Sequence, residues 1–266
     1  MEILDAILLG VVQGLTEFLP VSSSGHLQLA KELLGVELEN NITFDVLLHA
    51  ATVLSTMVVM WREIARLLKG LFARPEAPRR PNPEQRYGLQ ILLSMIPAGV
   101  VGICFAAEIE ACFSSLRFVG WMLLLTALLL TFASYAKPRQ RESLSYRDAF
   151  LIGCAQAAAT LPGLSRSGST IATGLLLGNN KERVAHFSFL MVIPVILGKM
   201  LLDILSGEMA SMTIGVGAMV AGFLAAFLSG ALACKFMIGV VKRGKLIWFA
   251  LYCAVVGTIA IISTIG

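Results

Sequence analysis

Hydrophobic residues along this chain come in long runs that short polar stretches separate. Two of these runs, 118–136 and 246–265, contain no charged residue, and each is close to the roughly 20 residues that a membrane-spanning helix needs. Segments that are long and apolar enough to cross a bilayer lie at 44–61, 88–107, 118–136, 186–204, 213–234 and 246–265. The pattern therefore predicts an all-α integral membrane protein with six transmembrane helices.

Composition agrees with this pattern. Of the 266 residues, 57% are hydrophobic and 14% are charged, and the mean hydropathy is +0.80. A soluble domain usually contains about a quarter charged residues, so the composition excludes a soluble globular protein. Glu2 and Asp5 stand where a cleaved signal peptide carries positive charge, so we expect the first apolar arm to be retained.

Charge in the loops predicts the orientation. Lys and Arg residues are frequent in 62–87, 137–147 and 235–245, whereas 108–117 and 205–212 contain few of them. Basic loops remain on the cytoplasmic side of a membrane. The first three loops are therefore predicted to be cytoplasmic, and the other two loops and both termini are predicted to lie outside.

Two stretches, 1–40 and 148–178, contain an apolar arm, a Pro and Gly break, and a second short arm. A full crossing by 148–178 would place the basic loop 235–245 outside, against the charge rule. Each stretch is therefore predicted to be a re-entrant hairpin, the first entering from outside and the second from inside. Because non-helical backbone at membrane depth must be covered by protein or line a water-filled cavity, we expect the two breaks to meet at a cavity.

The two hairpins also resemble each other in sequence. The run from Gln13 to Gly25 aligns with the run from Gln156 to Gly168, with one compensating gap on each side of the proline. Each hairpin is followed by three predicted spans. We therefore predict one membrane domain, 1–266, built as a 3+3 inverted-topology repeat of about 1–137 and about 148–266, and such repeats place polar sites near the midplane.

Gln13 and Glu17 stand four residues apart in the first hairpin, so a helix would project both from one face. Burial of an ionised Glu17 in an apolar arm is costly without a cation or a proton. A hard divalent cation could supply the compensation, held by these two residues, water and substrate phosphate. The alternative is a structural carboxylate that is protonated or paired with an arginine.

Ser22, Ser23 and Ser24 follow the Pro20 break, and His26 comes two residues later. Hydroxyls and a histidine at a helix N-terminus offer backbone N–H groups, a nucleophile and a proton carrier together. The serines could equally be helix caps or small packing residues, and the histidine a buried structural imidazole. Three ionisable residues at span ends are expected to be interfacial or helix-capping: Asp45, His49 and His186.

Arg166 is the most informative residue of the second hairpin. A permanently charged guanidinium at membrane depth needs an anion, and its planar fork matches phosphate oxygens. The neighbouring glycines, hydroxyls and helix N-terminus would complete an anion cradle, made of Gly163, Ser165, Ser167, Gly168, Ser169 and Thr170. A structural ion pair between Arg166 and Glu17 is the alternative, and both interpretations can hold together.

At these residues the chain resembles the undecaprenyl-diphosphate phosphatase family, integral membrane enzymes linked to bacitracin resistance. The resemblance covers essentially the whole length and rests on Gln13 with Glu17, on the run from Phe18 to His26, and on the run from Pro162 to Thr170. It implies removal of the terminal phosphate from a C55 polyprenyl diphosphate, with Mg²⁺ or Ca²⁺, at a site open to the outer side of the bacterial cytoplasmic membrane. In this chain Gln13 replaces the commoner Glu, and Ser24 stands where Thr is frequent.

The hypothesis that follows has catalytic roles for Glu17, Ser23, His26 and Arg166, with Ser22 and Ser24 beside the substrate. Ser23 would attack the terminal phosphorus while His26 or Glu17 carries the proton; attack by His26 or by a metal-bound water are rivals. A lipid-phosphate transporter would show a similar anion site, although it needs no nucleophile.

The expected partners are the polyprenyl diphosphate substrate and membrane lipid, and no nucleic acid. Small residues within 215–231 would permit close helix packing. The sequence leaves open whether this packing occurs within one chain or in a homodimer.

Overall fold

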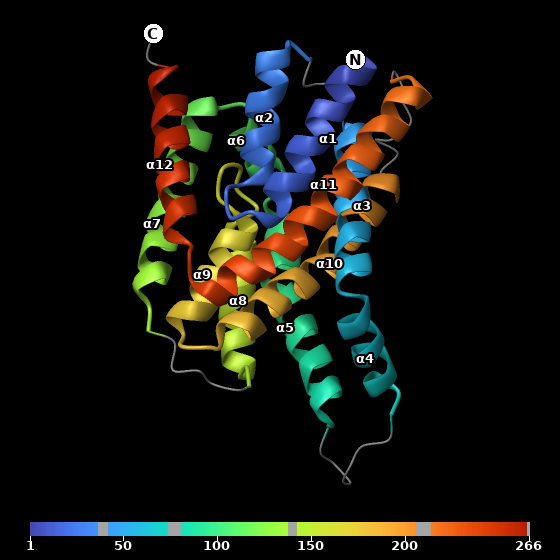
Figure 1. The fold of residues 1–266 in the computed structure, drawn as a ribbon, viewed down its shortest axis with the longest axis vertical. Helices are drawn as coiled ribbons and strands as arrows, with labels where there is room; N and C mark the ends of the chain where they lie inside the picture. Colours follow the sequence, from blue (N-terminus) through green and yellow to red (C-terminus); the bar gives the residue numbers. More distant parts are fainter. Residues whose placement is uncertain (37–41, 74–80, 138–142, 206–213, 265–266) are drawn as a thin grey trace.

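The structure is a computed structural model that describes residues 1–36, 42–73, 81–137, 143–205 and 214–264. The described residues form helices and connecting turns, with no β-strand among them (Figure 1). The helices are α1 Ile3–Phe18, α2 Ser23–Leu34, α3 Ile42–Val59, α4 Trp61–Leu71, α5 Pro83–Cys104, α6 Ala106–Phe113, α7 Leu116–Tyr135, α8 Tyr146–Ala158, α9 Arg166–Leu176, α10 Lys181–Leu205, α11 Val216–Arg243 and α12 Ile247–Ile262. The predicted all-α class is confirmed.

Four of these helices are long and apolar enough to cross a membrane: α5, α7, α10 and α11. A fifth crossing is obtained if α3 and α4, which meet at a bend of 78°, count as one broken span. Helix α12 is apolar but has only 16 residues. The protein is therefore a multi-pass membrane protein, while the number of six crossings stays a prediction.

The two ends of the bundle differ. Both chain termini and α6 lie at one end, and α4 with the start of α5 lies at the other (Figure 1). Helix α4 carries Arg62, Arg66 and Lys69, so basic charge collects at the end opposite the termini. Residues 206–212 of the loop 205–212, and parts of the loops 62–87 and 137–147, lie outside the described residues.

Three stretches that were expected to be loops are helical. Part of 62–87 forms α4, because Ile64 and Leu67 recur at helical spacing and pack against the core while the basic residues face outward. Part of 108–117 forms α6. Most of 235–245 continues α11, which ends only at Gly244, where the backbone adopts the left-handed φ of 68° that glycine favours.

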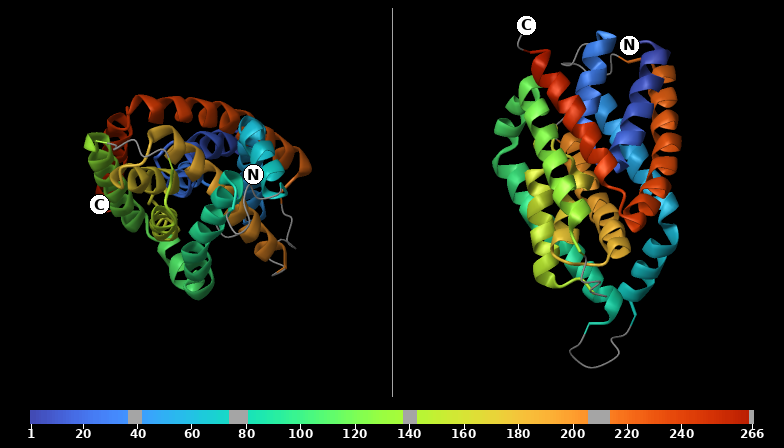
Figure 2. Two further views of the ribbon diagram at one scale, coloured as in Figure 1. Left: turned by 90° about the horizontal axis from the view of Figure 1, so that it is seen from below. Right: turned by 60° about the vertical axis from the view of Figure 1, so that its left-hand side comes forward.

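Each broken stretch forms two short helices around a turn, α1 with α2 and α8 with α9. Helix α1 packs along α11, and α8 packs along α5, while α7 packs along α12 (Figure 2). The approach of α1 to α11 is close enough that a Cβ on Gly14 would overlap Ser229. Ala218, Gly222 and Ala226 of α11 are buried, and a Cβ on Gly222 would overlap Phe44, so these small residues permit packing within the chain.

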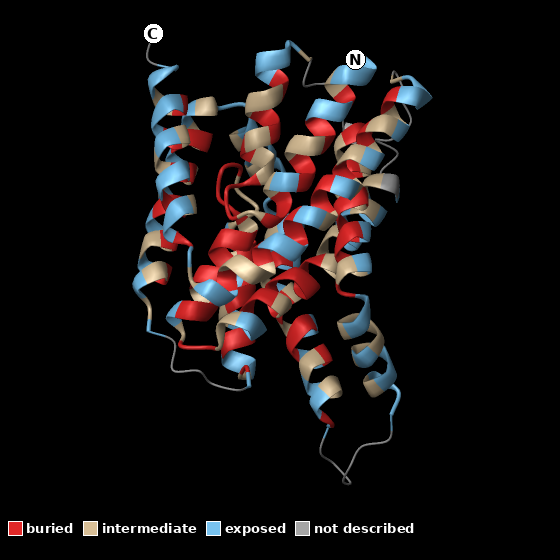
Figure 3. Ribbon diagram, in the orientation of Figure 1, coloured by how far each residue is buried: buried red, intermediate tan, exposed pale blue. Residues whose placement is uncertain are grey.

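Buried residues gather where the two hairpin turns meet, in the middle of the bundle (Figure 3). Val21 packs with Val119, Leu123 and Cys253 around the first turn. Large apolar side chains such as Leu232 stay exposed on the outer helix faces, which is the surface that lipid would cover. The fold therefore surrounds the two turns with protein while its outside remains apolar.

Candidate active site

The first hairpin turns sharply between Phe18, where α1 ends, and Ser23, where α2 begins. Among the described residues, Ser22 is the only non-glycine with a positive φ, at 71°. Its hydroxyl accepts from the backbone N–H of Gly25 at 3.3 Å and so caps α2. This unusual backbone conformation reverses the chain and turns Ser23 back toward the end of α1.

Glu17 is the centre of the polar cluster. Its side chain is 5% exposed, and it accepts hydrogen bonds from Ser23 Oγ at 2.7 Å and from Gln13 Nε2 at 3.0 Å. Its other carboxylate oxygen is paired with the guanidinium of Arg166. A buried carboxylate needs this compensation, because desolvation without a partner is costly. The structure thus brings Gln13, Glu17, Ser23 and Arg166 together from both hairpins.

Arg166 is held in place by the second turn. It is the first residue of α9, and the Ser165 hydroxyl caps this helix by accepting from the N–H of Gly168 at 3.0 Å. The hydroxyl of Thr126, on α7, donates to the carbonyl of Gly163 at 3.3 Å and accepts from the N–H of Ser165 at 3.0 Å. The turn that carries Arg166 is therefore fixed from α7.

Gly163 is required in this turn for two reasons. Its φ of +91° is rarely adopted by other residues, and a Cβ there would overlap the carbonyl oxygen of Val119. Gly168 lies at the contact between the turns, since a Cβ at this position would come within 3.3 Å of Pro20. The two glycines let the two hairpins approach each other closely.

The remaining hydroxyls of the predicted cradle divide into two groups. Ser167 Oγ lies 3.3 Å from Ser165 Oγ and donates to the carbonyl of Leu19 at 3.2 Å, so it joins the two turns. The Thr170 hydroxyl lies 2.6 Å from the hydroxyl of Ser188 on α10, and within the described residues no hydrogen bond joins it to Glu17. Ser169 is buried, and its hydroxyl has no partner among the described residues.

His26 points away from the cluster. Its Nδ1 lies 2.8 Å from the carbonyl oxygen of Ser22, and its Nε2 lies 2.8 Å from the hydroxyl of Tyr252 on α12. No hydrogen bond joins it to Glu17 or Ser23 within the described part of the chain. Ser24 Oγ lies 3.3 Å from Ser22 Oγ. His26 and Ser24 therefore hydrogen-bond to Ser22 in the turn rather than to the cluster. The proton acceptor that the Ser23 hydroxyl contacts is Glu17.

His49 belongs to the cluster although the sequence placed it at a span end. Its Nδ1 lies 3.0 Å from Gln13 Nε2 and 3.7 Å from Glu17 Oε2. The available signal was the stripe of Asp45, His49, Thr52 and Thr56, whose spacing of three and four residues defines one helix face. Asp45 instead pairs with the buried Lys31, at 2.6 Å and 2.7 Å.

One oxygen atom of the cluster is available to a divalent cation. Gln13 is fully buried, and its Oε1 has no hydrogen-bond partner among the described residues. An amide oxygen and a carboxylate are ligands that Mg²⁺ and Ca²⁺ accept, with water and phosphate completing the coordination. Within the described residues no group of three His, Cys, Asp or Glu side chains could hold a metal. The residues therefore fit a cation that shares its coordination with the substrate.

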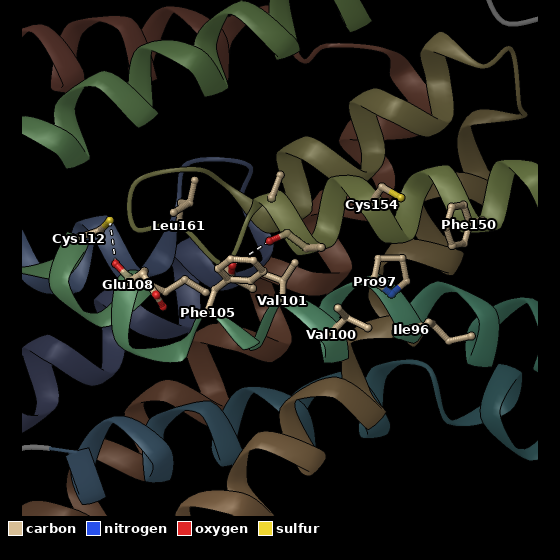
Figure 4. A pocket seen from close by; sticks show the side chains of 14 residues that line it. Ile96, Pro97, Val100, Val101, Phe105, Glu108, Cys112, Phe150, Cys154 and Leu161 are labelled. Carbon is tan, nitrogen blue, oxygen red and sulfur yellow. Dashed lines mark hydrogen bonds between the residues drawn. The ribbon is translucent and has the colours of Figure 1, made fainter. Parts of the chain in front are cut away.

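One hollow, and one narrow gap that is too small to hold a water molecule, lie near the turns. A small gap is lined by Glu17, Arg166, Thr52 and Thr56, with apolar residues of α1, α3 and α10. A larger hollow of about 740 Å³ runs between α5, α6 and α8 and reaches Thr160 and Leu161 at the second turn (Figure 4). Among the described residues that line the larger hollow, Glu108 carries the only charge. The polar chemistry therefore belongs to the small gap, while the larger hollow offers apolar surface.

Comparison with known proteins identifies the family of the chain. The family model described as bacitracin resistance protein BacA matches residues 6–259. A protein of Bacteroides fragilis named undecaprenyl-diphosphatase is 57% identical over 266 residues, which is 98% of each chain.

Proteins with the same name from Parabacteroides distasonis and Bacteroides thetaiotaomicron are similar to the same degree. The first is 56% identical over 98% of each chain, and the second is 55% identical over 99% of each chain. The match extends through both hairpins and all the helices around them, and the chain belongs to the bacitracin resistance protein BacA family.

Proposed function

We propose that this protein is an undecaprenyl-diphosphatase, which removes the terminal phosphate of undecaprenyl diphosphate to give undecaprenyl phosphate. The observation that carries the proposal is the cluster in which Arg166, Glu17 and Ser23 meet between two hairpin turns. The relatives that carry this name cover nearly the whole chain at 55–57% identity. The product is the lipid carrier used in peptidoglycan synthesis, and the family to which the chain belongs is described by its link to bacitracin resistance.

Arg166 supplies the anion-binding group. Its guanidinium is 19% exposed and pairs with Glu17, and two parallel N–H donors suit the oxygens of a phosphate. The gap would have to widen to admit a diphosphate, which would then compete with Glu17 for this guanidinium. Arg166 is the first residue of α9, so the N-terminus of this helix would add donors for the same anion. The Ser167 hydroxyl could join them only by leaving the carbonyl of Leu19.

Ser23 is the nucleophile that the geometry favours. Its hydroxyl already donates to Glu17 at 2.7 Å, which is the arrangement of a nucleophile with its general base. In the reaction, Ser23 Oγ forms a bond to the terminal phosphorus, the bond to the bridging oxygen breaks, and the proton passes to Glu17. Undecaprenyl phosphate leaves with the bridging oxygen, and water then hydrolyses the phosphoserine. Phosphoryl transfer depends mainly on such positioning and charge stabilisation.

Attack by His26 and direct attack by water are the two rivals. His26 is bonded to Ser22 and Tyr252 rather than to the cluster, so a phosphohistidine would require the ring to turn. Direct attack by water would leave the Ser23 hydroxyl as a substrate ligand. The bond between Ser23 and Glu17 favours the serine route, and it also favours an enzyme over a transporter, which needs no nucleophile.

A divalent cation, Mg²⁺ or Ca²⁺, is part of the proposal. Gln13 and Glu17 would hold it, since the Gln13 Oε1 atom is buried without a partner among the described residues. When bound, the cation would neutralise charge on the diphosphate. Glu17 would then have to share its carboxylate between this ion, Ser23 and Arg166, which implies that substrate binding rearranges the pair with Arg166.

The membrane arrangement that we propose has six transmembrane helices and two re-entrant hairpins in a 3+3 inverted repeat. The helix packing supports this arrangement. Helix α1, the first arm of the first hairpin, packs on α11 of the second half, and α8, the first arm of the second hairpin, packs on α5 of the first half. Helices α5 and α11 hold the same position in the two repeats. The protein would lie in the bacterial cytoplasmic membrane with the basic α4 end inside, and the site would open to the outer, periplasmic side. Association into a homodimer stays a prediction.

The test is phosphate release from a C55 or C15 prenyl diphosphate by purified protein in detergent, with Mg²⁺ or with EDTA. We expect metal-dependent release that Arg166→Ala abolishes. Arg117→Ala is the matched control, because Arg117 is an exposed arginine of α7 outside the cluster. Wild-type protein that is folded and releases no phosphate under any metal would overturn the proposal and favour lipid-phosphate transport.

A further inference from the structure

Tyr252 of α12 makes a hydrogen bond to His26 across 226 positions of sequence. Its hydroxyl lies 2.8 Å from His26 Nε2, and the two rings are nearly parallel, with 17° between their planes and 5.5 Å between their centroids. The phenol therefore contacts the imidazole both through its hydroxyl and through its ring. Such a paired contact fixes both the position and the plane of the imidazole.

The other nitrogen of His26 defines the protonation pattern. Nδ1 lies 2.8 Å from the carbonyl oxygen of Ser22, and a carbonyl oxygen can only accept a hydrogen bond, so Nδ1 carries a hydrogen. In the neutral ring Nε2 then bears the lone pair and accepts from the Tyr252 hydroxyl. When His26 is protonated, the Nε2–H donates to the same oxygen, so the bond persists in both charge states.

Tyr252 is itself held against the first turn by its neighbour. Cys253 is buried, and its Sγ lies 3.5 Å from the carbonyl oxygen of Pro20. Cys253 also packs with Val21, Val119 and Leu123. Tyr252 thus approaches His26 from a helix that is anchored to the same turn, while its own side chain is 45% exposed.

We propose that Tyr252 is a positioning residue for His26 and makes Nε2 the atom that takes up and releases a proton. The Tyr252 hydroxyl hydrogen-bonds to the Nε2 lone pair of His26. Because Tyr252 is partly exposed, this bond connects Nε2 to the surface of the bundle. The structural part of this inference stands on the two hydrogen bonds of His26. Its kinetic part rests on the proposed phosphatase function and on a proton transfer by His26 that is separate from the transfer from Ser23 to Glu17.

The experiment is carbethoxylation of the purified full-length protein in detergent by diethyl pyrocarbonate, with modification at His26 followed by mass spectrometry. The chain has three histidines, so each site can be followed separately. Tyr252→Phe keeps the ring and removes the hydroxyl, and we expect it to accelerate labelling of His26 about 2- to 10-fold, the effect of one hydrogen bond. Tyr135→Phe is the matched control, since Tyr135 is an exposed tyrosine at the end of α7.

Equal labelling rates of His26 in wild type and Tyr252→Phe would overturn the inference. In phosphate release we expect Tyr252→Phe to lower kcat about 2- to 10-fold with KM unchanged, because Tyr252 does not contact Arg166. Faster labelling together with wild-type kcat would overturn the role in proton transfer. Faster labelling in a protein that releases no phosphate at all would contradict the proposed function and leave the positioning role of Tyr252 intact.

Discussion

Ser23 Oγ lies 2.7 Å from Glu17 Oε2, although the two residues belong to different helices of the first hairpin. The contact depends on the turn at Ser22, which brings the start of α2 back to the end of α1. It gives a hydroxyl and a proton acceptor the spacing of a nucleophile and its base.

Replacement of this hydroxyl provides the first prediction. Ser23→Ala should lower phosphate release by ~10³-fold or more, as removal of an activated nucleophile does. Rapid quench with labelled substrate should find no phosphoenzyme in the variant. Ser134→Ala, which removes a helix hydroxyl of α7 that bonds to the carbonyl of Leu130, should behave as wild type. An acid-labile phosphoenzyme in Ser23→Ala would assign the attack to His26.

The effect of the Glu17–Arg166 ion pair on stability should be separable from its effect on activity. Glu17→Gln leaves the partly buried guanidinium without its charge partner, which should cost up to about 3–5 kcal/mol of unfolding free energy, the range for a fully buried pair. The double variant Glu17→Gln with Arg166→Met removes both charges, and thermal unfolding in detergent should show most of the stability restored. Phosphate release should be lost in both proteins. Recovery of activity together with stability would mean that the pair is only structural.

Gly163 should be sensitive to the smallest substitution. Gly163→Ala forces a side chain into a backbone conformation at φ +91° and against Val119, and such strain costs about 1–3 kcal/mol. The thermal unfolding midpoint should fall. Gly99→Ala is the control, because a Cβ at Gly99 of α5 would meet no atom within 4 Å and alanine is the better helix former. A Gly163→Ala protein as stable as Gly99→Ala would contradict the observed turn.

Gln13 offers a test of the proposed cation site. Gln13→Glu adds a negative charge beside Glu17, so the concentration of Mg²⁺ that gives half-maximal phosphate release should fall roughly tenfold. Gln90→Glu is a suitable control, because Gln90 is also a buried glutamine but bonds to the carbonyl of Leu144. An unchanged Mg²⁺ dependence in folded Gln13→Glu would remove Gln13 from the cation site.

His49 should matter more than its place in the sequence indicates. It contacts both Gln13 and Glu17, so His49→Ala should lower phosphate release about tenfold through loss of a hydrogen bond to the cluster. His186→Ala changes the same residue type on α10, outside the cluster, and should leave the rate near that of wild type. Equal rates in the two variants would show that His49 is a packing residue.

The sequence predicts an interaction wherever burial of a charged residue without a partner would cost free energy. Glu17 and Arg166 are charged residues in apolar arms, so each required a partner, and the structure pairs them. The two breaks around Pro20 and Pro162 were recognisable because proline and glycine interrupt a helix. The catalytic and binding roles of these residues stay predictions.

Other features depended on contacts between distant parts of the chain. The partner of His26 is Tyr252, and the hydroxyl of Thr170 meets Ser188; local spacing contains no information on such pairs. The place of His49 in the cluster arises from the approach of α1 to α3, which the polar stripe on α3 does not reveal by itself. The basic stretch 235–245 predicts a loop, but α11 continues through it to Arg243. Lysine and arginine are good helix formers, so basic residues alone do not mark the end of a helix.

Each hairpin turn is held by a helix from outside the hairpin: Thr126 of α7 bonds to the turn of the second hairpin, and Tyr252 and Cys253 of α12 contact the first. Helices α7 and α12 pack on each other. The two turns that carry the cluster are thus held by one pair of packed helices, α7 and α12. A displacement of the α7–α12 pair would therefore carry both turns with it and preserve the alignment of Glu17 with Arg166.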